Sequence, residues 1–190
     1  MAVTFTTTVT GVAGGVQSSY ELELTAALEG QFADIADNNV ATFVNETGAG
    51  VAFGDLLVVN TAGTVGNSAK TIAATGDTVV GVNALTYIEE KATDANGRPA
   101  ASDKQALNVV NQGVVAVYVT GAVDLTSPVR VYYATHTGTT AGAHPGRFSH
   151  AFVSGKTRRL SSARWVSKTT GAGIALLELN GPSFTLDADS

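Results

Sequence analysis

Short segments in which apolar and polar residues alternate dominate the sequence. A period of two is typical of β-strands with one buried face, whereas amphipathic helices repeat every 3.6 residues. Clusters of Gly, Pro, Asn and Asp interrupt these segments, as turns between strands do. The pattern predicts an all-β fold, a β-sandwich or barrel-like domain of about nine short strands. The expected strands are Val40–Val44, Val51–Val59, Thr78–Tyr87, Leu107–Val110, Gly113–Val119, Val129–Tyr133, Arg147–Val153, Leu160–Val166 and Gly173–Leu179.

One segment has the spacing of a helix. Apolar residues recur at helical intervals between Leu24 and Ile35, but Gly30 interrupts them. We therefore expect at most one short helix. Because no amphipathic stretches of helical length separate the strands, the sequence excludes a doubly wound parallel sheet.

The first 19 residues differ from the rest and predict an extended N-terminal arm before a β-rich domain spanning residues 20–190. Val3, Phe5, Thr7 and Val9 follow a period of two, and the glycine-rich stretch Gly11–Gly15 ends the segment. An exposed strand of this kind tends to pair with another chain. We interpret these four residues as contacts to a neighbouring protein.

Two stretches of the domain lack strand patterning. Residues 89–106 are polar, and residues 134–146 are rich in Gly and Thr. Both are predicted to be long loops, which in proteins are commonly functional or disordered.

Composition narrows the possible chemistry. The chain has 190 residues and no cysteine, so it has neither disulfides nor thiolate ligands. It shows no apolar run long enough for a membrane-spanning helix and no secretory signal at its start. We expect a soluble protein that stays where it is made and makes no membrane contact.

Charge is divided unevenly along the chain. Residues 1–124 carry 13 acidic and four basic residues, whereas residues 125–177 carry seven basic residues and no acid. Three interpretations of this basic segment remain: a basic loop that covers the protein's own acidic half, a docking surface for an acidic partner or subunit, and, least favoured, a nucleic-acid site. Nucleic-acid binders usually carry net positive charge, whereas this chain has a net charge of −5.

Candidate catalytic and metal-binding residues do not form a recognisable pattern. The three histidines, His136, His144 and His150, lie in or near the acid-free segment without the spacing of a metal site. Glu21 and Glu23 share one face of an alternating segment, which is more simply a solvated face. The sequence therefore predicts no cofactor, no metal and no enzymatic activity.

A series of short motifs runs through most of the chain in a fixed order. The motifs are Ala26–Asp34, Val44–Asp55, Val80–Asn83, Asn108–Val123, Val129–Tyr133, Gly146–Phe148 and Ala163–Gly181. Together they resemble the structural cement (capsid decoration) proteins of bacteriophages, in which a Leu-x-Gly-x-x-Ala-Asp turn precedes a Phe-Gly step into the next strand. Residues 1–19 depart from that pattern, and Asp55 stands where a small or basic residue is expected.

The resemblance implies a non-enzymatic virion protein on the capsid exterior, made in the cytoplasm of the host bacterium. Such a protein would clamp neighbouring subunits of the major capsid protein and stabilise the DNA-filled head. Its partners would be the major capsid protein and itself, as a homotrimer or another homo-oligomer, and it would bind no nucleic acid. With the arm, the expected contacts to capsid or sister subunits are Arg147, Arg158, Arg159 and Arg164.

A second function remains open at this point, because a β-sandwich does not define a function. The chain would then be a host- or glycan-binding appendage on the phage head or tail. Glycan sites usually cluster exposed aromatic residues, whereas the aromatic residues here are scattered apart from Tyr132 and Tyr133.

Overall fold

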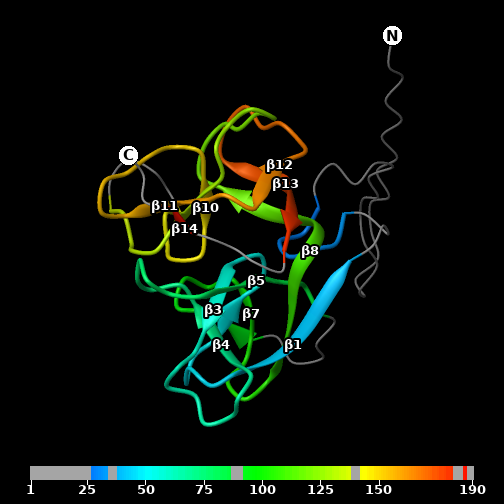
Figure 1. Cartoon of the computed structure of the whole chain (residues 1–190), viewed down its shortest axis with the longest axis vertical. Helices are drawn as coiled ribbons and strands as arrows, with labels where there is room; N and C mark the ends of the chain where they lie inside the picture. Colours follow the sequence, from blue (N-terminus) through cyan, green and yellow to red (C-terminus); the bar gives the residue numbers. More distant parts are fainter. Residues whose placement is uncertain (1–26, 34–37, 87–91, 138–141, 182–185, 188–190) are drawn as a thin grey trace, which may run out of the picture.

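The computed structural model describes residues 27–33, 38–86, 92–137, 142–181 and 186–187 (Figure 1). These residues form 14 strands and no helix, which confirms the all-β prediction. No described element has the form of a membrane-spanning helix. The strands are β1 (Asn39–Asn45), β2 (Val51–Ala52), β3 (Leu56–Val59), β4 (Ser68–Thr71), β5 (Val79–Asn83), β6 (Ala92–Thr93), β7 (Pro99–Ala101), β8 (Ala106–Val119), β9 (Arg130–Tyr132), β10 (Phe148–Ser149), β11 (Thr157–Leu160), β12 (Ala163–Trp165), β13 (Gly173–Asn180) and β14 (Leu186–Asp187).

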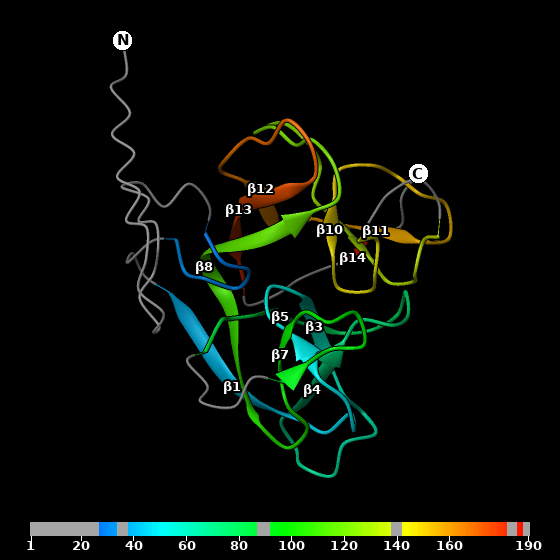
Figure 2. The same ribbon diagram turned by 180° about the vertical axis from the view of Figure 1, so that it is seen from behind.

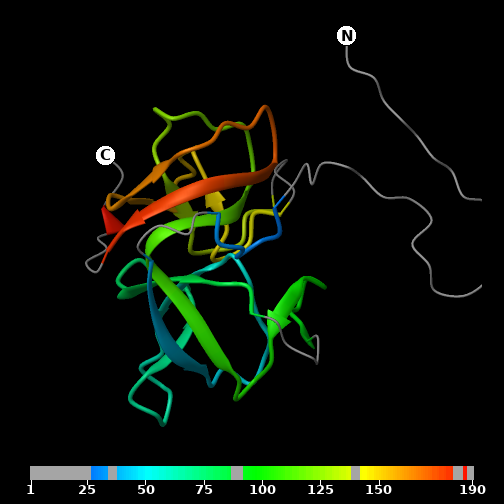
Figure 3. The same cartoon turned by 90° about the vertical axis from the view of Figure 1, so that its right-hand side faces the viewer.

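Strand β8 organises the fold. Its first half pairs with β1 and β5, and its second half pairs with β13 and β10. The partner on one edge changes at Gln112, which is aligned with Asn39 of β1 and with Asn180 of β13. Figures 1 and 3 show β8 running from one lobe of the molecule into the other.

The first lobe, called the barrel lobe here, is a closed sheet. Its strands follow the order β1-β4-β3-β5-β8, and β8 pairs back with β1. Closure removes the free edges that short strands would otherwise expose. A smaller sheet in the order β2-β7-β6 lies beside the barrel.

The second lobe, called the C-terminal lobe, is built on the other half of β8. Strands β10, β9, β11 and β14 extend the sheet in one direction, and β13 and β12 extend it in the other. Figure 2, from behind, shows these strands grouped away from the barrel. Phe148 and Trp165 meet edge to face at its centre, with ring centroids 6.3 Å apart.

One hydrophobic core passes through both lobes. It joins Leu56 and Val82 of the barrel lobe to Val131, Trp165 and Leu177 of the C-terminal lobe, all of them buried. A smaller cluster contains buried residues of β3, β4 and β8, packed against Phe43 of β1. The two lobes therefore pack as one continuous interior.

The strands differ from the prediction in number and bounds. The predicted strands Leu107–Val110 and Gly113–Val119 are one continuous strand, because backbone pairing on both sides of β8 overrides the turn-forming residues between them. Strand β4 and the two- and three-residue strands β6, β7 and β14 were missed, since such short or polar segments show no alternation. The predicted loop at residues 89–106 holds the β6–β7 hairpin, and the helical spacing near Gly30 corresponds, within residues 27–33, to a turn and a bridge.

Gly81 gives a test of the barrel closure. It has a φ of +144°, and a Cβ there would overlap the carbonyl oxygen of Val110. We expect Gly81→Ala to lower the free energy of unfolding by about 2 kcal/mol or more and the melting temperature by about 5 °C or more. Gly66→Ala is the control, because a Cβ at Gly66 meets no atom within 4 Å. Equal melting temperatures for the two variants in a calorimetric scan would contradict the described packing.

Candidate functional site

The segment that follows the N-terminal arm is fixed to β8. The amide of Gly30 donates to the carbonyl of Ala116 at 2.8 Å, and the amide of Ala116 donates to the carbonyl of Gln31 at 2.8 Å. Phe32 forms a bridge with Val115. We call residues 27–33 the arm root. The arm residues Val3, Phe5, Thr7 and Val9 lie outside the described residues, so their contacts stay a prediction.

Two of the family-like motifs meet at the arm root. Gly30 has a φ of +79°, and a Cβ there would lie 2.7 Å from the amide nitrogen of Leu85 and 3.0 Å from that of Gly54. Such distances leave no room for a side chain. Gly30 of the Leu-x-Gly turn and Gly54 of the Phe-Gly step therefore lie where two backbone segments cross closely.

A buried carboxylate, Asp55, lies beside this crossing. Its side chain is 2% exposed. Arg98 donates to both of its oxygens, from Nη1 to Oδ1 at 2.7 Å and from Nη2 to Oδ2 at 2.8 Å. The Nε of Arg98 donates to Asp94 at 2.7 Å. Because Arg98 belongs to the β6–β7 hairpin and Asp55 precedes β3, this two-point pair fastens the hairpin to the barrel.

Arg147 belongs to the same cluster and is buried. Its Nη1 lies 2.9 Å from Oε1 of Glu29 in the arm root, and its Nε lies 3.9 Å from Oδ1 of Asp55. Its guanidinium carbon is 4.4 Å from the ring centroid of Tyr118 on β8. The structure thus corrects the expectation that Arg147 faces an outside surface: it faces the acidic half of its own chain. We call Glu29, Asp55, Arg98 and Arg147 the buried charge cluster.

Burial determines the electrostatics of this cluster. Loss of water raises the pKa of Asp55 to about 6, although the hydrogen bonds and charge of Arg98 act in the opposite direction. Burial alone would lower the pKa of Arg98, but Asp55 and Asp94 together raise it. Burial, with the charges of Arg98 and Arg147, lowers the pKa of His144. The ion pairs therefore only partly offset the cost of burying the carboxylate.

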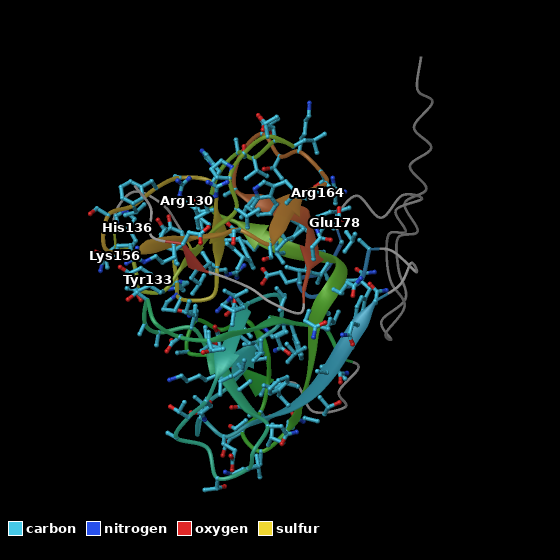
Figure 4. The ribbon with its side chains drawn as sticks, viewed as in Figure 1. Arg130, Tyr133, His136, Lys156, Arg164 and Glu178 are labelled. Atoms are coloured by element: carbon cyan, nitrogen blue, oxygen red, sulfur yellow. The ribbon has the colours of Figure 1, made fainter. Side chains whose placement is uncertain are left out.

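The remaining three predicted arginines lie on different surfaces. Arg164 on β12 pairs with Glu178 on β13, with 2.6 Å between Nε and Oε2. Arg158 and Arg159 are neighbours on β11, so their side chains leave opposite faces of the strand. Figure 4 shows Arg164 and Glu178 on the other side of the C-terminal lobe from Tyr133, which lies beside β11. The structure therefore does not gather the basic segment into a single patch.

An apolar depression lies next to the arm root. It has a volume of about 300 Å³. Phe53 and Leu85 line it from the barrel lobe, Ile174 from β13, and Leu28 from the arm root. The side chain of Leu28 is 64% exposed at this place. The depression is therefore a hydrophobic surface shared by both lobes.

The histidines make local contacts. His136 stacks on Tyr132 with 6.4 Å between ring centroids. The carbonyl of His150 accepts a hydrogen bond from Arg130. Across the described ranges, no group of three or more His, Cys, Asp or Glu residues is arranged to hold a metal ion.

Sequence reasoning missed the buried charge cluster. Glu29, Asp55 and Arg98 are far apart in the chain and follow no common spacing. The available signal was Asp55 itself, because a charged residue between the apolar segments Val51–Phe53 and Leu56–Val59 requires a partner when it is buried.

The fold of this chain is similar to that of a chain in a solved phage structure. A chain from "The capsid of Myoviridae Phage XM1" superposes with a TM-score of 0.64 over 88% of this chain and 98% of that chain. The two sequences are 14% identical, so the similarity concerns the fold. Among curated proteins, no significant match is found.

The sequence identifies the family. Residues 16–180 match the model of the structural cement protein family, described by E217 gp24 and Pam3 gp6. The chain belongs to this family and is a phage structural protein. The match begins at residue 16, so it leaves out most of the stretch predicted to be an arm.

The buried charge cluster gives a pH-dependent test. Arg98→Gln removes the main partner of Asp55, and we expect the free energy of unfolding at pH 8 to fall by about 3 kcal/mol or more. Because folding raises the pKa of Asp55 from 3.8 to about 6, the folded state is more stable when Asp55 is protonated. This stability is lost as the pH rises through 6. In Arg98→Gln the loss of stability extends to higher pH, because Arg98 no longer lowers the pKa of Asp55. The difference in unfolding free energy between the variant and wild type is therefore smaller at pH 5 than at pH 8.

Chemical denaturation at the two pH values measures this effect. Lys104→Gln is the matched control, because Lys104 is 67% exposed and an ion pair in water contributes little to stability. An Arg98→Gln penalty that is as small as that of the control, or that does not change between pH 5 and pH 8, would show that the cluster is not a buried charge pair.

Proposed function

We propose that this protein binds the outer surface of a phage icosahedral capsid and clamps neighbouring subunits of the major capsid protein. Membership of the structural cement family over residues 16–180 is the observation that carries the proposal. The fold shared with a chain of the phage XM1 capsid supports it. The role is structural and non-enzymatic, and the protein is made in the host bacterial cytoplasm before it joins the virion exterior.

The arm is proposed as one of the contacts. Val3, Phe5, Thr7 and Val9 would add a strand to a neighbouring subunit, because main-chain pairing needs few specific side chains. The described arm root supports this role, since its hydrogen bonds to β8 provide a fixed point from which an arm can act. The proposal includes self-association as a homotrimer or another homo-oligomer, with no contact to nucleic acid or membrane.

Arg158, Arg159 and Arg164 are proposed as electrostatic contacts to an acidic capsid or subunit surface. Arg159 and the side chain of Arg164 are exposed. Arg147 is left out because its charge is used inside the protein.

The direct test is rebinding. Purified protein is added to phage heads that lack it, and both bound protein and the temperature of head disruption are measured. We expect saturable binding and a higher disruption temperature, because many symmetric contacts act together. No binding at any concentration would overturn the proposal and favour the appendage function.

Deletion of residues 2–15 tests the arm. We expect the affinity for such heads to fall by about tenfold or more, because one of several linked contacts is lost. The melting temperature of the free protein is the control, and it should stay unchanged because the deleted residues precede the family match. Unchanged affinity would exclude the arm as a contact.

Salt dependence tests the arginines. If charge attraction contributes, affinity for the heads falls as the salt concentration rises through physiological strength, where the Debye length is about 8 Å. Affinity that does not depend on salt would leave packing as the only source of binding.

A further inference from the structure

An exposed aromatic side chain lies beside an arginine at one side of the C-terminal lobe. Phe152 is 55% exposed and lies in the loop between β10 and β11. The guanidinium carbon of Arg130 is 5.9 Å from the Phe152 ring centroid, within the range of cation–π attraction. Arg130 also donates from Nη1 to the carbonyl of His150 at 2.7 Å, which holds the guanidinium next to this loop.

A second arginine lies directly across the strand pair. Arg159 of β11 is the Cα partner of Arg130 of β9, so the two side chains leave the same face of the sheet. Arg159 is exposed and makes no ion pair within the described part of the chain, even though Asp187 is its Cα partner on β14.

We propose that Arg130, Phe152 and Arg159, here called the Arg130–Phe152 surface, dock an acidic surface of another protein, with Phe152 as the apolar anchor. Arginine and aromatic residues dominate the energetically important positions of protein interfaces. This proposal rests on the capsid-binding function proposed above, which makes the major capsid protein the partner of this surface.

The charges of the described residues favour a different protein over a second copy of this chain. In the barrel lobe, Asp55 and Asp94 are paired with Arg98, and Glu46 is paired with Lys104. Asp77 and Asp103 accept hydrogen bonds from backbone amides. Among the described carboxylates of that lobe, Asp55, Asp94 and Glu46 are therefore already ion-paired within this chain and less available to the arginines of a neighbouring copy.

Nucleic acid fits the surface less well than protein does. A nucleic-acid site needs a basic stripe that follows successive phosphates, and such proteins usually carry net positive charge. Here the surface holds two arginines around one phenylalanine, on a chain with a net charge of −5.

Figure 4 shows the region concerned: Arg130 lies on the same side of the C-terminal lobe as Tyr133, His136 and Lys156. Tyr133 is itself paired with an arginine, since the guanidinium carbon of Arg158 lies 5.9 Å from its ring centroid. Alternation along the paired strands β9 and β11 places Tyr133 and Arg158 on the face of the sheet opposite to Arg130 and Arg159, so this second pair is separate from the proposed surface.

Two matched pairs of full-length variants test the proposal by binding to phage heads that lack this protein. Phe152→Ser is compared with Leu125→Ser, because both side chains are 55% exposed. Arg159→Glu is compared with Lys168→Glu, because both residues are exposed in the acid-free segment and both changes alter the charge equally. Melting temperatures of all four proteins confirm that they fold.

We expect Phe152→Ser and Arg159→Glu each to weaken binding by about tenfold or more, and the controls to stay within about twofold of wild type. Arg159→Glu should also reduce the dependence of affinity on salt. A short DNA duplex is the second probe: binding of DNA that depends on Arg159, with unchanged binding to heads, would overturn the proposal.

These measurements distinguish failure of the Arg130–Phe152 surface as the docking site from failure of capsid binding itself. If wild type binds the heads and Phe152→Ser binds equally well, the Arg130–Phe152 surface is not the docking site, while capsid binding stands. If wild type fails to bind the heads at all, the capsid-binding function is overturned and this proposal falls with it.

Discussion

The fold depends on one strand that both lobes share. The 14 residues of β8 supply one strand of the closed barrel and the centre of the C-terminal lobe, and they also receive the arm root. The main hydrophobic core continues across this strand, so the lobes are joined by backbone hydrogen bonds and by packing together. The positions of the other surfaces follow from it: the arm root lies on β8, and the Arg130–Phe152 surface lies on strands added to its second half.

The buried charge cluster adds a different kind of connection. Hydrophobic packing holds the lobes together without specifying direction, whereas the two-point contact between Arg98 and Asp55 has a defined geometry. Replacing a buried ion pair by apolar residues often increases stability, so such pairs contribute more to specificity in some proteins. In this chain the cluster links the β6–β7 hairpin, the start of β3, the residue before β10 and the arm root, four segments that are distant in the sequence.

The sequence predicted the class of the fold because alternation reports burial on one face of a strand. Val40–Val44 and Gly173–Leu179 were placed almost as observed in β1 and β13. It could not predict the continuity of β8, because the Asn-Gln-Gly segment is typical of a turn and only its partners on both sides keep it extended. Sequence order likewise gave no sign that Arg147 would be enclosed while Arg159 stayed exposed, because only the pairing of β9, β10 and β11 decides which side chains are covered.

The shared strand has a consequence for the order of folding. The barrel pairs residue 39 with residue 112, and the arm root pairs residue 32 with residue 115, so both must wait until β8 has been synthesised. Contacts so distant in sequence slow the folding of all-β proteins. The barrel strands all precede residue 120, whereas the second half of β8 is covered by β13, residues 173–180, so the C-terminal lobe is completed after the strands of the barrel lobe have been synthesised. The arm root therefore gains its fixed position together with the barrel lobe, before the strands that cover the second half of β8 are in place.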